Sequence, residues 1–422
     1  MRSITFKAPT LAGKRSYLCG IILAASSVAG AAEAQSLPQF STGADISDYG
    51  YIQSNGGSYG YNGQPTGMLP ALQDAGINTV RLRLFNNATP AEIQADGALN
   101  TLNNLAYDLP LLQQVKQAGF YSVLNMHLSD TWADPGHQAP PAAWAGLSLS
   151  EMESQVYTYC DTTITALRQA NAMPDMVTVG NEINGGLLWP TGQLNGTSAQ
   201  WSAMAGLLNS AIAGVDAGSN GQKPEIMLTV GGSNSPASFF NKLSSLGVNY
   251  DVIGYDYYPF YQGAVSNLQS QLTNLATVGK PIILAETAYP WINNSSNSSY
   301  SGQPGFDYPF TPAGQAAYAA AMIADVKAIP NGLGRGVWWW GGEYTADQAD
   351  FANNSWSYRS LFDASGNALP ALNTLGQSAS SVPEPGSLAL LAAAAVLVLL
   401  GACPSKRRVA IPARRDDFWH SA

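Results

Sequence analysis

Eight short runs of apolar or β-branched residues recur along the chain, and segments of helical periodicity lie between them. The runs are residues 43–47, 79–84, 121–125, 176–180, 226–230, 252–255, 281–285 and 336–340. The clearest helical segments are residues 109–118, 151–169, 198–215, 265–277 and 312–329. Eight strand and helix units in about 340 residues predict an α/β fold, a single-domain (β/α)8 TIM barrel over residues 35–378. An open doubly wound sheet is less favoured, because no glycine-rich phosphate turn follows the first run.

The first 34 residues have the organisation of a signal peptide. Four basic residues come before an apolar run at residues 18–29, and Ala32-Glu33-Ala34 supplies small residues before a cleavage point. The alternative is a transmembrane anchor, for which the apolar run is short. We therefore expect residues 1–34 to be removed on export, so that Gln35 begins the mature chain.

Residues 379–422 form a second segment with the pattern of a targeting signal. Pro383-Glu384-Pro385 comes first, an uncharged apolar stretch follows at residues 388–400, and Lys406-Arg407-Arg408 comes next. A short apolar helix with a positive flank predicts a membrane stop. The order of these parts resembles the PEP-CTERM sorting signal of Gram-negative bacteria. This resemblance implies a secreted or cell-surface protein that is transiently anchored in the inner membrane through its C-terminal helix.

The charge of the chain between these two segments limits its partners. Residues 35–378 contain 24 acidic and 10 basic side chains, so they repel nucleic acids and anionic lipids. The 10 Trp and 20 Tyr residues of the chain either stack on sugar rings or fill a large core. Cys160 is the only cysteine in this part, which excludes an internal disulfide and a cysteine-based metal site there. We expect a monomer with a neutral polymer as its partner and with no cofactor or metal.

Two glutamates directly follow predicted strands. Glu182 comes after the fourth run, and Glu286 comes after the seventh. A TIM barrel keeps its chemistry at the carboxyl ends of its strands, and strands four and seven nearly face each other across the mouth. A lone glutamate at a strand end is more often a surface charge, but a pair of this kind suits glycoside hydrolysis. A separation of about 5–5.5 Å would give retention of configuration at the anomeric carbon.

The two glutamates should have different environments. We expect Glu286 to be the ionised nucleophile, held by a positive donor, and Arg83 at the end of the second run is the best candidate for that donor. Glu182 should be the acid/base, with a raised pKa, because it must hold a proton and then take it back.

Six blocks of sequence resemble one family of glycoside hydrolases in the same order. They are residues 43–47, 78–83, 127–136, 180–190, 257–260 and 286–289. Asn181-Glu182 and Glu286 resemble clan A of the glycoside hydrolases, and the blocks resemble its family 53, the arabinogalactan endo-β-1,4-galactanases. The resemblance implies an endo-acting hydrolase of the β-1,4-galactan in type I arabinogalactan, with Glu182 as proton donor and Glu286 as nucleophile.

The same resemblance implies a set of supporting residues. Asn181 would hold the sugar 2-hydroxyl, Asp134 would line the substrate cleft, and Tyr258 lies in one of the matching blocks. His127 is either an orienting hydrogen-bond group or a core histidine. Trp189, Trp291, Trp338 and Trp340 are candidate stacking platforms, with core packing as the alternative for each.

The chain also departs from the family pattern. Asn125 and Leu128 replace an acid and an aromatic residue, Tyr255-Asp256 stand where small residues are common, and Gln262 replaces a frequent substrate-contacting His. The loop at residues 293–305 has no carboxylate, so we expect no calcium there. Two rivals stay open: another clan A endo-glycanase, such as a β-1,4-mannanase or β-1,4-glucanase, and a non-catalytic carbohydrate-binding surface protein.

Overall fold

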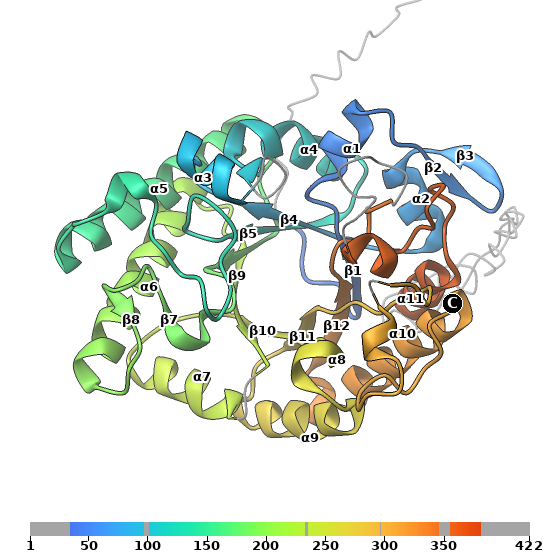
Figure 1. Ribbon diagram of the computed structural model, residues 1–422. Coiled ribbons are helices and arrows are strands. Elements are labelled where there is room, and N and C mark those ends of the chain that lie inside the picture. Colours follow the sequence, from blue (N-terminus) through green and yellow to red (C-terminus); the bar gives the residue numbers. More distant parts are fainter. Residues whose placement is uncertain (1–33, 97–100, 233–234, 296, 346–354, 381–422) are drawn as a thin grey trace, which may run out of the picture. The chain divides into compact units, whose positions relative to one another are not determined.

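The computed structural model describes residues 34–96, 101–232, 235–295, 297–345 and 355–380, and a closed barrel of eight parallel strands lies at its centre (Figure 1). In their order around the barrel the strands are β1 (Ser41–Asp45), β12 (Gly334–Trp339), β11 (Ile282–Glu286), β10 (Val252–Asp256), β9 (Glu225–Gly231), β6 (Met176–Val179), β5 (Tyr121–Met126) and β4 (Thr79–Leu84). Each coincides with one of the eight predicted runs to within two residues at either end. The predicted TIM barrel is confirmed.

Helices surround the barrel, and two short hairpins form separate two-stranded sheets (Figure 1). The described helices are α1 (Tyr49–Ser54), α2 (Met68–Ala75), α3 (Pro90–Asp96), α4 (Leu105–Gln117), α5 (Leu149–Gln169), α6 (Ser198–Ser219), α7 (Pro236–Ser245), α8 (Pro259–Gln262), α9 (Val265–Leu275), α10 (Pro312–Lys327) and α11 (Pro370–Ser380). The hairpins pair β2 (Tyr59–Tyr61) with β3 (Gln64–Thr66), and β7 (Gly186–Leu187) with β8 (Gly192–Gln193). Helix α4 begins four residues earlier than its periodicity predicts, because the Asn104 side chain caps it by accepting from the Tyr107 N–H.

Large side chains fill the inside of the barrel below its mouth. This interior layer consists of Tyr121, Val123, Met176, Met227, Val252, Ile283, Ala285 and Trp338, together with Leu37. The Trp338 side chain is 0% exposed, and its Nε1 atom donates to Ser41 Oγ at 2.7 Å. Its ring fills the space that the missing side chain of Gly43 leaves. The prediction that Trp338 is a substrate-binding residue is therefore wrong, and its core-packing alternative is right.

A β-bulge shapes the end of β11. Leu284 pairs with Tyr255 of β10, but the next pair is Glu286 with Asp256, so Ala285 is an extra residue on β11. Ala285 belongs to the interior layer. Strict alternation would then turn Glu286 outward, but a bulge can direct two successive side chains to the same face. The bulge thus explains how Glu286 also reaches the inside of the barrel.

The predicted signals at the two ends of the chain lie almost entirely outside the described residues. These are the signal peptide at residues 1–34 and the sorting segment at residues 379–422 with its apolar helix. In the part of the chain that the structure describes, no helix is both long enough and apolar enough to cross a membrane.

Candidate active site

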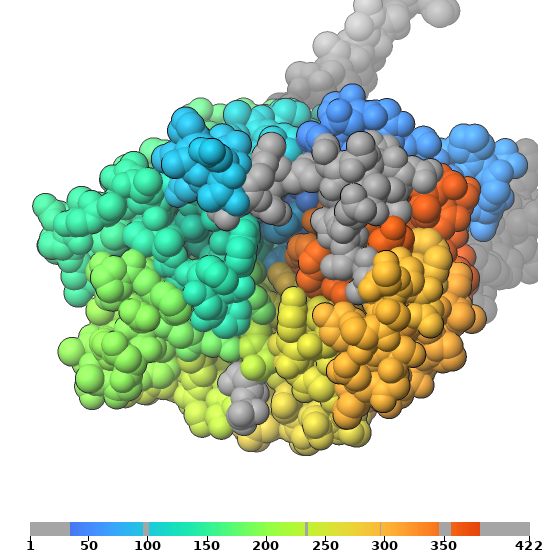
Figure 2. Space-filling view, in the orientation of Figure 1, coloured from blue at the N-terminus to red at the C-terminus, as the bar shows by residue number. Residues whose placement is uncertain are grey.

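A cleft of about 360 Å³ opens at the carboxyl ends of the strands. Figure 2 shows this face hollowed near its centre, beside the segment of α8. The residues that line the cleft are Arg83, His127, Trp132, Ala133, Asp134, Asn181, Glu182, Tyr258, Tyr261, Glu286, Trp340, Tyr344 and Trp356. Seven of the nine predicted site residues are among them, and Trp189 and Trp338 are not.

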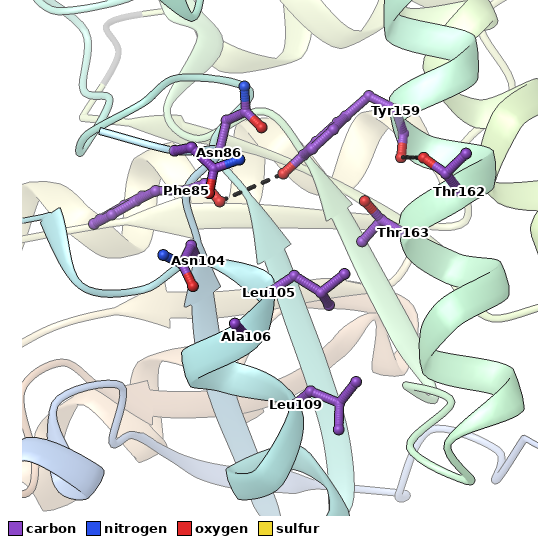
Figure 3. A pocket seen from close by; sticks show the side chains of 10 residues that line it. Phe85, Asn86, Asn104, Leu105, Ala106, Leu109, Tyr159, Thr162 and Thr163 are labelled. Carbon is purple, nitrogen blue, oxygen red and sulfur yellow. Dashed lines mark hydrogen bonds between the residues drawn. The ribbon is translucent and has the colours of Figure 1, made fainter. Parts of the chain in front are cut away.

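A larger cavity, of about 560 Å³, lies elsewhere, between α4 and α5 (Figure 3). Leu105 and Leu109 come from α4, and Tyr159, Thr162 and Thr163 line the opposite wall from α5. None of its ten lining residues is charged. It therefore lacks the pair of carboxyl groups predicted to carry the chemistry, whereas the cleft at the barrel mouth contains both, so this cleft is the candidate active site.

Both carboxylate oxygens of Glu286 are held by the protein. Arg81 Nη2 lies 2.7 Å from Oε1, and the Tyr258 hydroxyl donates to Oε2 at 2.7 Å. Arg81 is fully buried, and its other amino group pairs with Asp45 Oδ2 at 3.1 Å. Charge-assisted hydrogen bonds of this kind favour the ionised carboxylate and fix its orientation. The carboxylate of Glu286 is thus fixed in orientation where it lines the cleft.

The prediction that Arg83 holds Glu286 is wrong, because Arg81 does so. Arg83 pairs instead with Asp48 at 2.9 Å and with Asp45 at 3.5 Å, and its guanidinium lies 5.4 Å from the centre of the Trp340 ring. Arg81 and Arg83 are two positions apart on β4, so both point into the barrel. Arg81 lies one step deeper, where its guanidinium reaches the end of β11.

Glu182 has a contrasting environment. Its backbone is left-handed, with φ of 46°, and its N–H donates to Thr229 Oγ1 at 2.9 Å. The carboxyl group packs against Gly231, where any side chain would overlap it. Burial raises the pKa of Glu182 well above its usual value, the carboxylates of Glu286 and Asp134 raise it further, and Arg81 opposes them. Glu182 therefore keeps its proton at pH values where an ordinary glutamate has lost it.

Hydrogen bonds fix Asn181 next to the two glutamates. Its Oδ1 atom accepts from Arg81 at 3.0 Å and from Asn125 at 2.8 Å, and its Nδ2 atom donates to Ala133 O at 2.8 Å. His127 lies in the same network, since its Nδ1 atom accepts from the Ala133 N–H at 2.8 Å. Burial lowers the pKa of His127 well below its usual value, and Arg81 and Arg83 lower it further, so the ring is neutral. The ring lines the cleft as a hydrogen-bonded group.

Aromatic side chains form much of the cleft wall. Trp132, Tyr261, Trp340, Tyr344 and Trp356 all line it, and Tyr261 is 69% exposed. Of these only Trp340 had been singled out from the sequence as a stacking candidate. Trp132 and Tyr344 lie in irregular segments, and Tyr261 and Trp356 lie in short helical turns, so no periodic pattern marks them.

The remaining predicted residues have three different positions. Asp134 lines it and pairs with His137 at 2.8 Å. Trp189 lines a neighbouring cavity of about 310 Å³. Trp291 is buried, and its Nε1 atom donates to Ser357 O at 3.2 Å.

The structure also shows the positions of two residues that depart from the family pattern. Leu128 is buried in the core, and Gln262 Oε1 accepts from the Tyr258 N–H at 2.6 Å. Gln262 thus supports the segment that carries Tyr258. Across the described ranges, no three His, Cys, Asp or Glu side chains are grouped so that they could hold a metal ion.

The exchange of Arg81 for Lys tests which arginine supports the nucleophile. We expect Arg81→Lys to lower kcat about 10- to 100-fold, because lysine keeps the charge but cannot bind Glu286, Asp45 and Asn181 together. Steady-state kinetics would measure the loss, with circular dichroism to verify folding. Arg83→Lys is the matched variant and should cost clearly less in kcat. An equal or larger loss for Arg83→Lys would contradict the assignment of Arg81.

Comparisons with known proteins point to one family. The model of "Glycosyl hydrolase family 53" matches residues 41–375. The chain is 33% identical to a probable arabinogalactan endo-beta-1,4-galactanase A of Aspergillus fumigatus, over 70% of this chain and 82% of that protein. It is 30% identical to an arabinogalactan endo-beta-1,4-galactanase of Cellvibrio japonicus, over 85% of this chain and 96% of that protein.

A solved structure agrees with these sequence matches. The family 53 (GH53) catalytic domain of Ignisphaera aggregans superposes with a TM-score of 0.71 at 30% identity, covering 82% of this chain and 98% of that one. The family match covers all eight strands and both glutamates of the cleft. The chain therefore belongs to glycosyl hydrolase family 53.

Proposed function

We propose that the protein is a secreted, retaining endo-β-1,4-galactanase that hydrolyses the galactan of type I arabinogalactan, with Glu182 as acid/base and Glu286 as nucleophile. The observation that carries this proposal is the contrast between the two glutamates of one cleft. Arg81 and Tyr258 bind the two oxygens of Glu286, which suits its carboxylate form, while burial raises the pKa of Glu182 well above its usual value and favours its acid form. A pair with these opposite states is what double displacement at an anomeric carbon requires.

The first half of the reaction would form a glycosyl-enzyme. A Glu286 oxygen attacks the anomeric carbon from the face opposite the glycosidic oxygen, and the bond to that oxygen breaks. Glu182 gives its proton to the departing oxygen, so the leaving sugar is released as a neutral alcohol. The products of this half are an α-linked ester on Glu286 and an ionised Glu182.

The second half would hydrolyse that ester. Glu182, now a base, takes a proton from water as the water oxygen attacks the anomeric carbon, and the bond to Glu286 breaks. Glu286 is released as a carboxylate, which Arg81 and Tyr258 are placed to receive. Two inversions give net retention, and both glutamates return to their starting states.

Asn181 is suited to hold the 2-hydroxyl of the sugar. Its amide nitrogen has two N–H groups, and Ala133 O takes one of them. The bonds from Arg81 and Asn125 to its oxygen fix the direction of the second N–H. A donor oriented in this way can strengthen its bond to the 2-hydroxyl in the oxocarbenium-like transition state.

The substrate assignment rests on the relatives and on the chemistry of the cleft. Two relatives that match most of this chain are named arabinogalactan endo-beta-1,4-galactanases. The aromatic wall suits stacking on sugar rings, and the acidic chain favours a neutral polymer. No feature of the cleft specifically favours a mannanase, a glucanase or a non-catalytic binding protein.

Hydrolysis of a panel of linear polysaccharides tests this function. We expect β-1,4-galactan to be cut, with mannan and cellulose left intact, and proton NMR of fresh digests to show the β-anomer first. Cleavage of mannan or cellulose without galactan would overturn the substrate. If the α-anomer appeared first, the retaining mechanism would be wrong.

The localisation is proposed from the ends of the sequence alone. Residues 1–34 would direct export, and residues 379–422 would hold the protein transiently in the inner membrane before release or display at the surface. A protein exported from a Gram-negative host should begin at Gln35, which N-terminal sequencing would test. An exported chain that kept residues 1–34 would overturn the predicted cleavage.

A further inference from the structure

Asp256 is a buried carboxyl group that lies beside Glu286 in the barrel sheet. It is the last residue of β10 and pairs with Gly231 of β9 on one side and Glu286 of β11 on the other. Val252 belongs to the interior layer, and alternation along β10 brings the Asp256 side chain to the same face. The side chain is 0% exposed and is not among the residues that line the cleft. Asp256 can therefore act on the reaction only through its neighbours.

Among the residues that the structure describes, neither carboxyl oxygen of Asp256 has a hydrogen-bond partner. Glu286, by comparison, has a partner on each oxygen. A buried carboxylate without partners is costly, so the neutral acid is the favoured form of Asp256. Burial raises the pKa of Asp256 well above its usual value, Glu286 and Glu182 raise it further, and Arg81 opposes them.

The ionisable groups around Asp256 come from four parts of the barrel. Arg81 faces it from β4, Glu182 from the end of β6, Glu286 from β11, and Tyr258 from the segment after β10. Arg81 is the one cation in this set, and it is already paired with Glu286 and Asp45. This positive charge cannot balance the ionisation of Glu182, Asp256 and Glu286 together.

We propose that Glu182, Asp256 and Glu286 form a three-carboxyl centre that holds two protons in the resting enzyme, one on Glu182 and one on Asp256. Asp256 is then a positioning residue for the proton of Glu182, a role that rests on the proposed function of Glu182 as the acid. As the pH rises, the two acids lose their first proton as a coupled pair. Once Asp256 is ionised, its charge helps Glu182 to keep the remaining proton, so the acid form survives to higher pH.

The variant Asp256→Asn removes this ionisation while keeping the shape of the side chain. We expect the alkaline limb of the kcat/KM profile to move to lower pH by about one unit, because Glu182 loses a neighbour that can become negative. The acid limb should stay in place, since a buried Asp256 with a raised pKa is neutral at low pH, as asparagine is. A profile whose alkaline limb does not move would overturn the proposal, whatever the change in kcat.

Asp108 provides the matched control. It is a buried carboxyl on α4 whose pKa burial also raises, but its charged neighbours are Arg83, Asp48 and Asp45. Asp108→Asn should therefore leave the alkaline limb of kcat/KM where it is. If Asp108→Asn shifted this limb as much as Asp256→Asn does, the effect would not belong to the three-carboxyl centre.

Infrared spectroscopy tests the proton on Asp256 without turnover. In protein labelled with ¹³C at the aspartate carboxyls, the spectrum of the wild type minus that of Asp256→Asn at neutral pH should contain the C=O band of a protonated acid. A carboxylate band in its place would overturn the two-proton centre. The measurement uses the resting enzyme, so a failed assignment of Glu182 and Glu286 as catalytic residues would leave the acid band in place.

Discussion

Replacement of Glu286 by Ala should lower kcat on galactan by about 10⁴-fold or more, because the carboxylate that forms the covalent intermediate is then missing. Glu286 lies at the end of β11 with each of its oxygens held by one donor, Arg81 or Tyr258. The variant leaves these two donors in place and removes the carboxylate that attacks the anomeric carbon. Oligosaccharide binding should persist, and calorimetry would measure it beside the kinetics.

Azide distinguishes the loss of the nucleophile from general damage to the cleft. In Glu286→Ala, azide can enter the vacated space and attack from the same face as the missing carboxylate, while Glu182 still protonates the leaving group. The product should therefore be an α-glycosyl azide, which NMR identifies. Tyr258→Phe is the control, because it removes one hydrogen bond to Glu286 but keeps the nucleophile, so its activity should not depend on azide. Full activity of Glu286→Ala, or a β-configured azide product, would contradict the assignment.

The sequence predicts the barrel and its two glutamates for a simple physical reason. Strands buried on both faces must be nearly continuous apolar runs, and such runs are visible without any knowledge of their neighbours. A charged residue directly after such a run is conspicuous, and Glu182 and Glu286 both follow one. The fold class and this pair of carboxylates could therefore be predicted.

The depth of a side chain along the barrel axis could not be predicted from the sequence. Arg81 and Arg83 share one face of β4, yet only the deeper one contacts Glu286. Trp338 and Trp340 are also two residues apart, yet Trp338 fills the core while Trp340 lines the cleft. The alternation of side chains tells which face a residue occupies and carries no information about its height above the barrel floor.

Contacts between residues on different strands could not be predicted from the pattern of apolar and polar residues either. Asp256 could be recognised as unusual, but its closeness to Glu182 and Glu286 depends on the pairing of β10 with β9 and β11. The bulge at Ala285 depends on the register between two strands and leaves no mark in the order of residues. The closeness of these carboxyl groups and the bulge both depend on how the strands pair in the folded barrel.

Glu182→Ala should lower kcat/KM on galactan by about 10²- to 10⁴-fold, since the departing sugar oxygen must then leave without a proton. A substrate with a dinitrophenyl leaving group needs no such help, so its glycosylation by Glu286 should stay fast. The second half of the reaction would lack its base, so the glycosyl-enzyme should accumulate. The dinitrophenol released in the first turnover should then appear as a burst. Stopped-flow absorbance would measure this burst.

The pH profile and the azide product complete the assignment of Glu182. Because the pKa of Glu182 is raised, the wild type should lose activity as the pH rises through that value and the proton is lost. Glu182→Ala should lack this alkaline limb. Azide should rescue it from the face opposite to Glu286 and give a β-glycosyl azide, the anomer opposite to the one expected from Glu286→Ala. Equal losses on galactan and on the dinitrophenyl substrate would show that Glu182 does not act as the acid, because only an acid discriminates between the two leaving groups.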